Sequence, residues 1–598
     1  MADSRWPSGL LSAKRYTLSA NNMSSSIITT DKAKCRDCYR CVRVCPVKAI
    51  RIADGQARVD ADRCIVCGTC VRECPQRAKH VRSDLDKLAA LLESPGLTIA
   101  SVAPSFPAAF GDYGGGLLPS ALKKLGFGLV TETAVGAELV ARATAELIGE
   151  KKNSWVTSAC PVVVNLIELY YPEACRNITP IVSPMEAHAR YLKGKFGEES
   201  KVVFIGPCAA KKGEAEGDPA SAVDAVLTFE ELHQALDEAK IGHQGLDPVT
   251  FDDVRPANAQ LFPLEGGLAK TASIAADLLR EDFAALSGSE HVREMIDHLS
   301  EQSPIVLFEA LFCPGGCING PCLGPSKDVY ARRSRVLQYH KRKTFAAEKE
   351  LDPASAKSVD LVKRIGAIRV PQVAFSDEQI RAVLKETGKN TEEDELNCGA
   401  CGYSSCKENA RAVLLGMAER SMCLPWMRQL AERKTVQIID ASPNGIVMVD
   451  SEFNIVSFNP AFWRMFDCTS AIIGRPISTL MDPADFEQVA AELVPRISGK
   501  TVSFPQYNLV ANESIYRLEG ENVLIGIFAN ITRTKEEEDR IARMRAETLE
   551  SAERVIDQQM RMAQEIASIL GETTSETRVL LRKLTDLARQ EDEQQDKS

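Results

Sequence analysis

The sequence has no long apolar run and no long basic run, and each absence excludes a class of function. No segment of the 598 residues is apolar for long enough to span a bilayer, and the first 22 residues lack the uninterrupted apolar stretch of a secretory signal. The formal charge of −10, without a tract of Lys and Arg, argues against general nucleic-acid binding. We expect a soluble, cytoplasmic, multidomain α/β protein with protein and redox partners.

Histidine is scarce whereas cysteine is abundant. The chain has 7 histidines, none of them after His340, and 19 cysteines. Without an export signal these thiols are expected to be reduced and metal-bound, not paired in disulfides. Residues 1–30 are polar and Ser-rich, so we expect a flexible N-terminal tail there.

Eight cysteines form two equal runs, each followed by proline. The runs are Cys35, Cys38, Cys41 and Cys45 before Pro46, and Cys64, Cys67, Cys70 and Cys74 before Pro75. In a two-cluster ferredoxin the fourth cysteine of each run ligates the other run's cluster. We therefore expect one 4Fe-4S cluster on Cys35, Cys38, Cys41 and Cys74 and a second on Cys64, Cys67, Cys70 and Cys45. Residues 31–85 would be an α+β electron-relay domain; structural zinc is the alternative.

Three further segments carry cysteines in distinctive surroundings. They are TSACP at 157–161, GPCAAKKGE at 206–214 and FEALFCPGGCINGPCLG at 308–324, in which a Pro-Gly-Gly turn separates Cys313 from Cys317. Cys160 and Cys208 both follow apolar stretches that predict strands. Thiolates spaced as in the third segment are typical metal ligands.

These three segments resemble the signature segments of iron-iron hydrogenases, in the family's order. The resemblance covers about residues 30–330 and implies an α/β iron-hydrogenase catalytic core at 95–330. It also implies an H-cluster, in which four cysteines hold a 4Fe-4S cluster and the last bridges to a two-iron site with CO, cyanide and dithiolate ligands. In this chain the ligands would be Cys160, Cys208, Cys313 and Cys317.

The same resemblance suggests roles for other residues. Lys211 would hydrogen-bond an iron-bound cyanide, although a surface lysine is the alternative, and Glu214 would form a local ion pair. Ser105 lies in a loop that in the family touches the two-iron ligands. Glu146 is a candidate proton carrier near the end of a predicted helix at 133–146, with a solvated helix face as the alternative.

The chain departs from catalytic members of the family around the open iron. It has Ala159 where those members have a second cysteine, Gly206 where they have methionine, and Leu311-Phe312 where they have methionine-alanine. Every cluster ligand is intact, which favours retuned chemistry over drift in a decaying gene. Cys175 and Cys322 match no ligand position.

A connector with basic and mixed-charge helical segments is expected at 331–388. A small helical domain at 389–430 then carries Cys398, Cys401, Cys406 and Cys423, the last at the end of an amphipathic helix built on Ala410, Val413, Leu414 and Met417. This resembles single-cluster domains of anaerobic redox proteins and would hold one 4Fe-4S cluster, with zinc as the alternative.

Residues 434–534 resemble an α+β PAS domain. Alternating apolar residues predict a hairpin that leads into a helix at Asn459-Pro460-Ala461. A PAS domain holds haem, flavin or nothing; the usual haem histidine is missing, and Cys468 is expected to be packed. The ligand remains open.

Residues 535–598 predict output helices, as a hairpin or a dimeric coiled coil. They contain no histidine that could accept a phosphoryl group, which argues against a histidine kinase.

The combination indicates a sensory iron-iron hydrogenase of low turnover, active in anaerobic hydrogen sensing and signal transduction. Its partners would be dihydrogen, a ferredoxin-like or other redox partner and a second copy of the chain, and the family resemblance suggests a signalling phosphatase or kinase as the output. A ferredoxin-linked hydrogenase of dihydrogen metabolism and an iron-sulfur redox sensor without the two-iron site are the alternatives.

Overall fold

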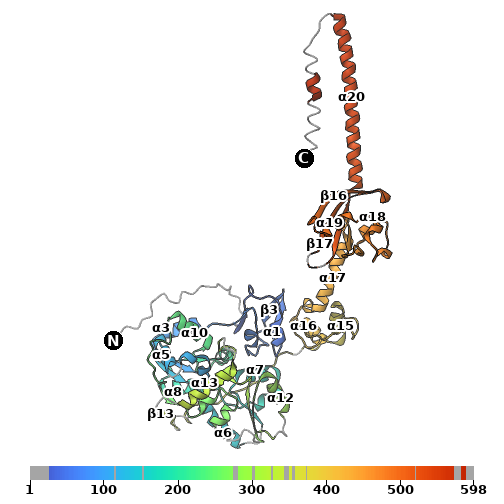
Figure 1. The fold of residues 1–598 in the computed structure, drawn as a ribbon. Helices are drawn as coiled ribbons and strands as arrows, with labels where there is room; N and C mark the ends of the chain where they lie inside the picture. The colour runs from blue at the N-terminus through green and yellow to red at the C-terminus, as the bar shows by residue number, and fades with distance from the viewer. Residues whose placement is uncertain are drawn as a thin grey trace. The chain divides into compact units, whose positions relative to one another are not determined.

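The structure is a computed structural model that divides into two compact units, residues 1–427 and 428–598 (Figure 1). It describes residues 26–113, 116–150, 154–273, 281–299, 304–324, 328–342, 349–352, 357–371, 373–518, 520, 522–570 and 581–586. Within these residues, no helix is long and apolar enough to cross a membrane.

The N-terminal cluster domain is made of two short antiparallel pairs and two short helices. Strand β1 (Ile28–Thr30) pairs with β4 (Lys79–Val81), and β2 (Ile50–Ala53) pairs with β3 (Gln56–Val59). Helices α1 (Arg40–Val44) and α2 (Thr69–Arg72) carry the middle of each cysteine run. The expected tail at 1–30 is corrected at its end, because Ile28 is buried and residues 28–30 complete the β1–β4 pair.

The core domain contains two parallel sheets in the described residues. One has the order β6 (Leu129–Glu132), β5 (Thr98–Val102), β8 (Lys201–Gly206), β9 (Ala225–Thr228). The other has the order β11 (Phe283–Ser287), β12 (Leu307–Leu311), β7 (Trp155–Val156). Every residue of β5 and β12 is buried, as expected for parallel strands covered on both faces. The strands expected before Ser105 and Cys208 are therefore present.

Helices surround these sheets. Those that position the site are α6 (Ala134–Glu150), α7 (Pro161–Tyr170), α8 (Pro184–Phe196) and α9 (Ala210–Gly217). The others are α3 (Leu85–Glu93), α4 (Phe106–Ala109), α5 (Leu117–Leu125), α10 (Phe229–Glu238), α11 (Gly267–Thr271), α12 (Ser289–His298) and α13 (Val329–Arg342). A short parallel pair joins β10 (Val254–Arg255) to β13 (Lys349–Glu350).

The expected connector at 331–388 is divided between its neighbours. Helix α13 packs through Val336 into the core cluster, and α15 (Asp377–Glu386) packs on α16 (Cys406–Leu414). Between them, residues 357–371 run mostly extended along the core domain. Both helices bury an apolar face, so they belong to the folded domains they contact.

The small cluster domain differs from its prediction in one detail. Helix α16 ends at Leu414, and Met417 lies beyond it, where its carbonyl accepts a hydrogen bond from the Ile52 amide of β2 at 2.9 Å. Cys423 follows the short 3-10 turn Arg420–Met422, not the amphipathic helix. Residues of this domain, of the N-terminal cluster domain and of α7 share one apolar cluster, so the three pack together.

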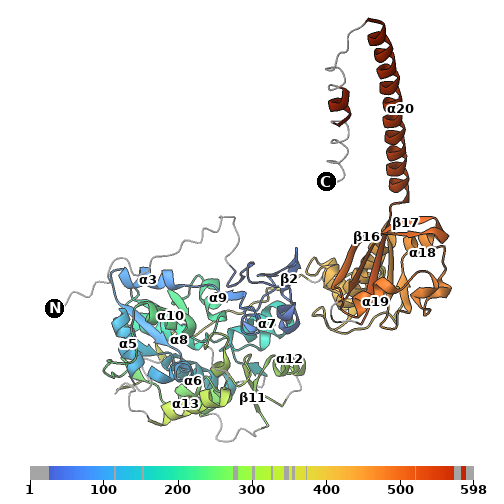
Figure 2. The ribbon, with the colours of Figure 1, turned by 45° about the horizontal axis from the view of Figure 1, so that its top comes forward.

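The second unit contains the PAS domain and a long helix. In the described residues its antiparallel sheet has the order β15 (Ile455–Phe458), β14 (Gly445–Val449), β18 (Leu524–Asn530), β17 (Leu509–Arg517), β16 (Arg496–Phe504). Figure 2 labels the last two of these strands. Helices α18 (Pro460–Phe466) and α19 (Ala484–Ala490) accompany it. Asn459 caps α18 by accepting from the Phe462 amide at 3.0 Å, which confirms the expected hairpin and helix start.

Helix α17 (Leu424–Ala441) precedes the PAS sheet and α20 (Thr532–Leu570) follows it. Residues 571–580 lie outside the described residues, so the choice between hairpin and coiled coil stays a prediction.

Candidate functional site

The four predicted H-cluster cysteines lie at the carboxyl ends of parallel strands from both sheets. Cys160 follows β7 and precedes α7, Cys208 follows β8, and Cys313 and Cys317 follow β12. In open parallel sheets the carboxyl ends are where ligands bind, because the loops there converge. Ser105, after β5, lies at the same edge as Cys208.

Thiols of this set raise the pKa of their neighbours, as expected for groups that lie close together. Burial, and then the neighbouring Cys160, raises the pKa of Cys208 to about 11. Burial, followed by Cys208, Cys160 and Cys317, raises the pKa of Cys313 well above its usual value. Four partly buried thiols around one place form the donor set of an iron-sulfur cluster. Burial favours the neutral thiols, whereas a bound cluster would keep the sulfurs as thiolates.

The Pro-Gly-Gly turn brings Cys313 and Cys317 to this place. Gly315 and Gly316 have φ of +78° and +95°, and a Cβ on Gly316 would lie 2.3 Å from the Pro263 carbonyl oxygen. That oxygen accepts from the Cys317 amide at 2.8 Å. Only glycine meets both demands, because it tolerates positive φ and leaves room for the Pro263 backbone.

Lys211 is buried and paired beside the cysteines. Its Nζ lies 2.6 Å from Glu214 Oε2, and its charge lowers the pKa of Cys208 and Cys317 against the larger effect of burial. Burial raises the pKa of Glu214, but the ammonium groups of Lys211 and Lys363 outweigh it and lower the pKa overall. The structure thus places Lys211 inside the site and not on the surface.

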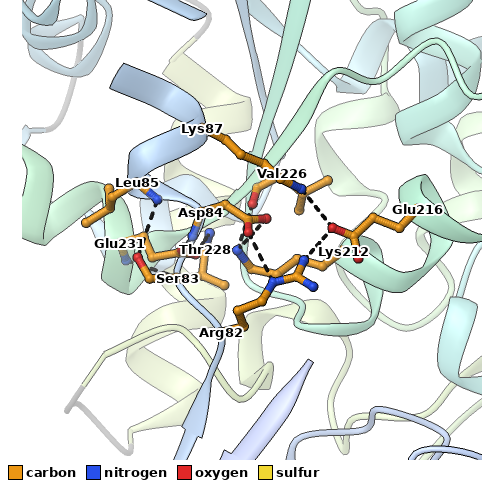
Figure 3. A network of polar contacts seen from close by, with 10 residues as sticks. All are labelled: Arg82, Ser83, Asp84, Leu85, Lys87, Lys212, Glu216, Val226, Thr228 and Glu231. Atoms are coloured by element: carbon orange, nitrogen blue, oxygen red, sulfur yellow. Dashed lines mark hydrogen bonds and ion pairs between the residues drawn. The ribbon is translucent and has the colours of Figure 1, made fainter. Parts of the chain in front are cut away.

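Helix α9 is held by the residue that follows Lys211. Lys212 is fully buried, with Nζ 3.0 Å from Asp84 Oδ2, 2.9 Å from Glu231 Oε1 and 2.9 Å from the Val226 carbonyl oxygen (Figure 3). Arg82 pairs with both Asp84 and Glu216. Because Arg82 and Asp84 come directly after the N-terminal cluster domain, this network ties that junction to the helix that carries Lys211.

The three departures have local structural reasons or consequences. A Cβ on Gly206 would lie 2.6 Å from the Phe204 ring, so a larger residue at position 206 would require that ring to move. Leu311 and Phe312 are buried. Ala159 lies against an apolar cluster that includes residues of α6. The side chain beside Cys160 is thus a methyl group in apolar surroundings.

The other predicted residues lie in different settings. Ser105 is buried, and its hydroxyl has no hydrogen-bond partner among the described residues, so it is free to meet a bound group. Glu146 lies exposed on α6, which gives the solvated-face alternative more support than the buried proton carrier. Cys322 is buried beside Cys208, and Cys175 is partly exposed.

The N-terminal runs cross as their spacing predicts. One cavity is lined by Cys35, Cys38, Cys41 and Cys74. In the other set, burial raises the pKa of Cys64 to about 12; Cys67 and Cys45 also raise it, and the Val66 amide opposes them. Cys45 also raises the pKa of Cys67 and of Cys70. The fourth thiol of each run therefore lies with the first three of the other.

The small domain has a cysteine-lined cavity of its own. It is lined by Cys398, Cys401, Cys406 and Cys423, together with Lys389, whose Nζ lies 3.3 Å from Cys423 Sγ. Among the described residues, no three His, Cys, Asp or Glu side chains are grouped to hold a single metal ion. The four sulfurs and an adjacent ammonium fit an anionic iron-sulfur cluster.

Three titratable residues near the site were not identified from sequence. Glu309 on β12 is buried, accepts from the Leu268 and Ala269 amides at 3.1 and 3.2 Å, and burial raises its pKa to about 7. Its place as the one carboxylate in the apolar strand LFEAL was a usable clue. Lys212 and Lys363 gave no such signal, since Asp84 and Glu214, their respective partners, are more than a hundred residues away in sequence.

Comparison with known proteins follows the same division of the chain. Residues 97–321 match the family described as iron only hydrogenase large subunit, C-terminal domain, and residues 27–75 match the 4Fe-4S dicluster domain. Residues 394–425 match a putative Fe-S cluster family, and residues 434–497 match the PAS domain.

Individual relatives are similar over about half of the chain. Iron hydrogenase 1 of Clostridium pasteurianum is 28% identical over 395 residues, which cover 52% of this chain and 69% of that protein. The NADP-reducing hydrogenase subunit HndD of Solidesulfovibrio fructosivorans is 26% identical over 372 residues, 51% of this chain and 58% of that protein. A solved variant of the hydrogenase HydA1 from Chlamydomonas reinhardtii is 19% identical, covers 48% of this chain and 100% of its own, and has a TM-score of 0.36.

Proposed function

We propose that this chain, an iron-iron hydrogenase-like protein with a PAS domain, is a sensory hydrogenase. It would react slowly and reversibly with dihydrogen and pass the resulting redox state through 4Fe-4S clusters to the PAS domain and its output helices. Cys160, Cys208, Cys313 and Cys317 would hold the H-cluster, which supplies the site for dihydrogen cleavage. Lys211 would donate to a cyanide, and the unpartnered Ser105 hydroxyl would meet the ligands of the two-iron site.

Ala159 is the observation that carries the sensory role. Turnover needs a proton carrier close to the reacting site, and a thiol with a free pKa of ~8.5 can release and regain a proton near neutral pH. The methyl group of Ala159 lies against apolar residues and can do neither. Slow cycling suits a sensor, which reports dihydrogen without consuming it.

The test is a pair of activity assays on the matured chain with a strong artificial donor and acceptor. We expect low turnover in both directions, and Ala159→Cys should recover part of the ~100- to 10,000-fold that a positioned general acid contributes. Ala159→Ser, which adds a hydroxyl that titrates poorly, is the matched control. Fast hydrogen evolution by the unmodified chain would favour the metabolic hydrogenase instead.

Infrared spectroscopy separates the remaining alternative. A matured chain with a two-iron site shows CO and cyanide stretches, whereas a chain that binds only 4Fe-4S clusters shows none. Iron analysis should give about 18 atoms, from four 4Fe-4S clusters plus two irons. Absent stretches with about 16 irons would identify the non-catalytic redox sensor.

The arrangement of cysteines supports a branched electron path in the first unit. Cys67 acts electrostatically on Cys313, and the Arg72 guanidinium lies 3.5 Å from the Asn319 carbonyl oxygen, so the second N-terminal cluster would neighbour the H-cluster. Burial raises the pKa of Tyr403, and Cys401 and Cys45 add to this effect, so the small domain's cluster would lie near the same N-terminal cluster. That cluster would therefore be the branch point.

Replacing Cys401 tests the branch toward signalling. Cys401→Ala should leave dihydrogen reduction of the N-terminal clusters intact, measured by electron paramagnetic resonance, and abolish the output. Cys175→Ala, which alters a thiol outside every cluster set, is the control. Normal signalling by the Cys401 variant would make the small domain's cluster structural.

The output helices are proposed to dimerise. Helix α20 exposes apolar side chains at Ile541, Met544, Val555, Met562 and Ile566, between 46% and 56% accessible. Such a stripe on a charged helix is stabilised by burial against a partner. Truncation after Thr534 should yield a monomer in sedimentation that keeps its infrared spectrum; a truncated dimer would assign dimerisation elsewhere.

A further inference from the structure

Residues 357–371, here called the strap, lie along the core domain between α13 and α15. The strap makes backbone hydrogen bonds with the core at both ends: the Val182 amide donates to Leu361, and the Val370 amide donates to Leu169, at 2.9 and 3.0 Å. Between these, the Lys363 amide donates to Pro180 at 3.1 Å. Leu169 is on α7, the helix that begins after Cys160. The strap is thus hydrogen-bonded to the last turn of α7 and to the segment that leads into α8.

Lys363 extends from the strap to the partner of Lys211. Its Nζ lies 3.8 Å from Glu214 Oε1, while Lys211 occupies Glu214 Oε2. The three side chains are 22%, 10% and 10% exposed, so solvent screens these charges only in part. The order of charges is positive, negative, positive. Lys363 adds one positive charge to this group, and its charge also lowers the pKa of Glu168 on α7 against the larger effect of burial, so Glu168 is a second carboxylate near Lys363.

We propose that Lys363 is a positioning residue for the dihydrogen site, acting on Lys211 through Glu214. By sharing the carboxylate, Lys363 leaves more of the Lys211 charge and its remaining N–H donors available to the two-iron ligands. A positive charge added beside the site favours its reduced form, so Lys363 keeps the reduction potential higher than it would be without that charge. The inference rests on the proposed function, because it requires an H-cluster at this place.

The charge of Lys363 comes from the strap and not from the three cysteine-containing segments of the core domain. The strap leads from the core domain directly to α15 of the small cluster domain. Any change that moves the strap would alter the potential of the site, and by thermodynamic reciprocity reduction of the site would alter how tightly the strap is held. Hydrogen exchange of the strap should therefore depend on the redox state of the site, and it can be measured without an activity assay.

The experiment uses the matured full chain and three variants. Lys363→Met removes the charge, Lys363→Arg retains it, and Arg364→Met removes an equal charge from the next, exposed residue of the strap. The reduction midpoint is read from the CO and cyanide bands during infrared-monitored titration, which reports only on loaded sites even if a variant loads less. Hydrogen exchange of residues 359–371 is measured in oxidised and dihydrogen-reduced protein.

We expect Lys363→Met to move the midpoint to a more negative potential, to shift a cyanide band, and to remove the redox dependence of exchange in the strap. Lys363→Arg should resemble the parent and Arg364→Met should leave the midpoint unchanged. Equal midpoints for Lys363→Met and Arg364→Met, with normal bands, would overturn this inference alone. A parent chain without CO and cyanide bands would overturn the proposed function and this inference with it.

Discussion

Residues 26–423 and the PAS domain have interiors of different kinds. The first contains four sets of cysteines, several of them buried thiols with raised pKa values, beside buried charged networks such as that of Lys212. The PAS interior is packed with aromatic rings, and Phe462 and Phe466 have their centroids 4.5 Å apart. The cysteine sets predicted to hold clusters therefore all lie in the first region, whereas the described interior of the PAS domain is held by aromatic packing.

Iron removal should separate the two regions most strongly. Metal binding coupled to folding contributes on the order of 10 kcal/mol, and the cysteine sets are buried around their clusters. Chelation under reducing conditions should therefore abolish hydrogen-exchange protection near the cysteines, whereas strands β14 to β18 should keep theirs. Equal loss in the PAS strands would show that its stability depends on the clusters.

Lys212→Met tests the charged network of the first region. Removing the ammonium leaves Asp84 and Glu231 buried beside each other, and loss of one partner of a buried ion pair typically costs about 3–5 kcal/mol. Thermal unfolding should show this loss in the first region only. Lys87→Met is the matched control, because Lys87 is 50% exposed and its pair with Glu216 should contribute at most ~1 kcal/mol.

Phe466→Ala tests the aromatic interior of the PAS domain. Phe466 is fully buried and contacts the rings of Phe462, Phe504 and Phe528, so its truncation should cost about 3–5 kcal/mol. Exchange protection of the PAS strands should fall while iron content and infrared bands stay unchanged. Trp463→Ala, at a side chain 49% exposed, should have a much smaller effect. Altered infrared bands in the Phe466 variant would contradict the separation of the two regions.

Glu513 should give the PAS domain a modest pH dependence. Burial first, and then Asp485, raises the pKa of Glu513 to about 7 against the opposing effect of Lys500. The folded state binds this proton more tightly than the unfolded state, so the stabilisation is full below about pH 4.5 and is lost as the pH rises through 7. Glu513→Gln should flatten the dependence by on the order of 1–3 kcal/mol. Exchange of β17, corrected for intrinsic rates at pH 5.5 and 8.5, measures it; an unchanged slope would exclude Glu513 as its source.

What could be predicted from sequence was local. Cysteine spacing, the strands before Ser105 and Cys208, and the hairpin before Asn459 depend on neighbouring residues, and the structure has them where expected. The sequence predicted that α16 extends to Met417, because Met417 continues the apolar spacing. The helix instead ends at Leu414, and the Met417 carbonyl accepts a hydrogen bond from the Ile52 amide of β2.

Long-range features could not be predicted from spacing. The β1–β4 pair joins residues about fifty positions apart, and the pairs Lys212–Asp84 and Lys363–Glu214 each join residues more than a hundred positions apart. Nothing local to a lysine identifies a carboxylate that only the folded chain brings near. Glu309 could be predicted in part. Its place in an apolar strand indicates that it is buried, but its hydrogen-bond partners Leu268 and Ala269 could not be predicted from the sequence.

The origin of the H-cluster cysteines bears on assembly. Cys208 comes from the four-stranded sheet, whereas Cys160, Cys313 and Cys317 come from the sheet that contains β7 and β12. A 4Fe-4S cluster bound by all four cysteines would cross-link the two sheets through its iron–sulfur bonds. Oxidative loss of the cluster would then remove one link between the sheets, while the apolar packing of α6 and α8 continues to hold them together.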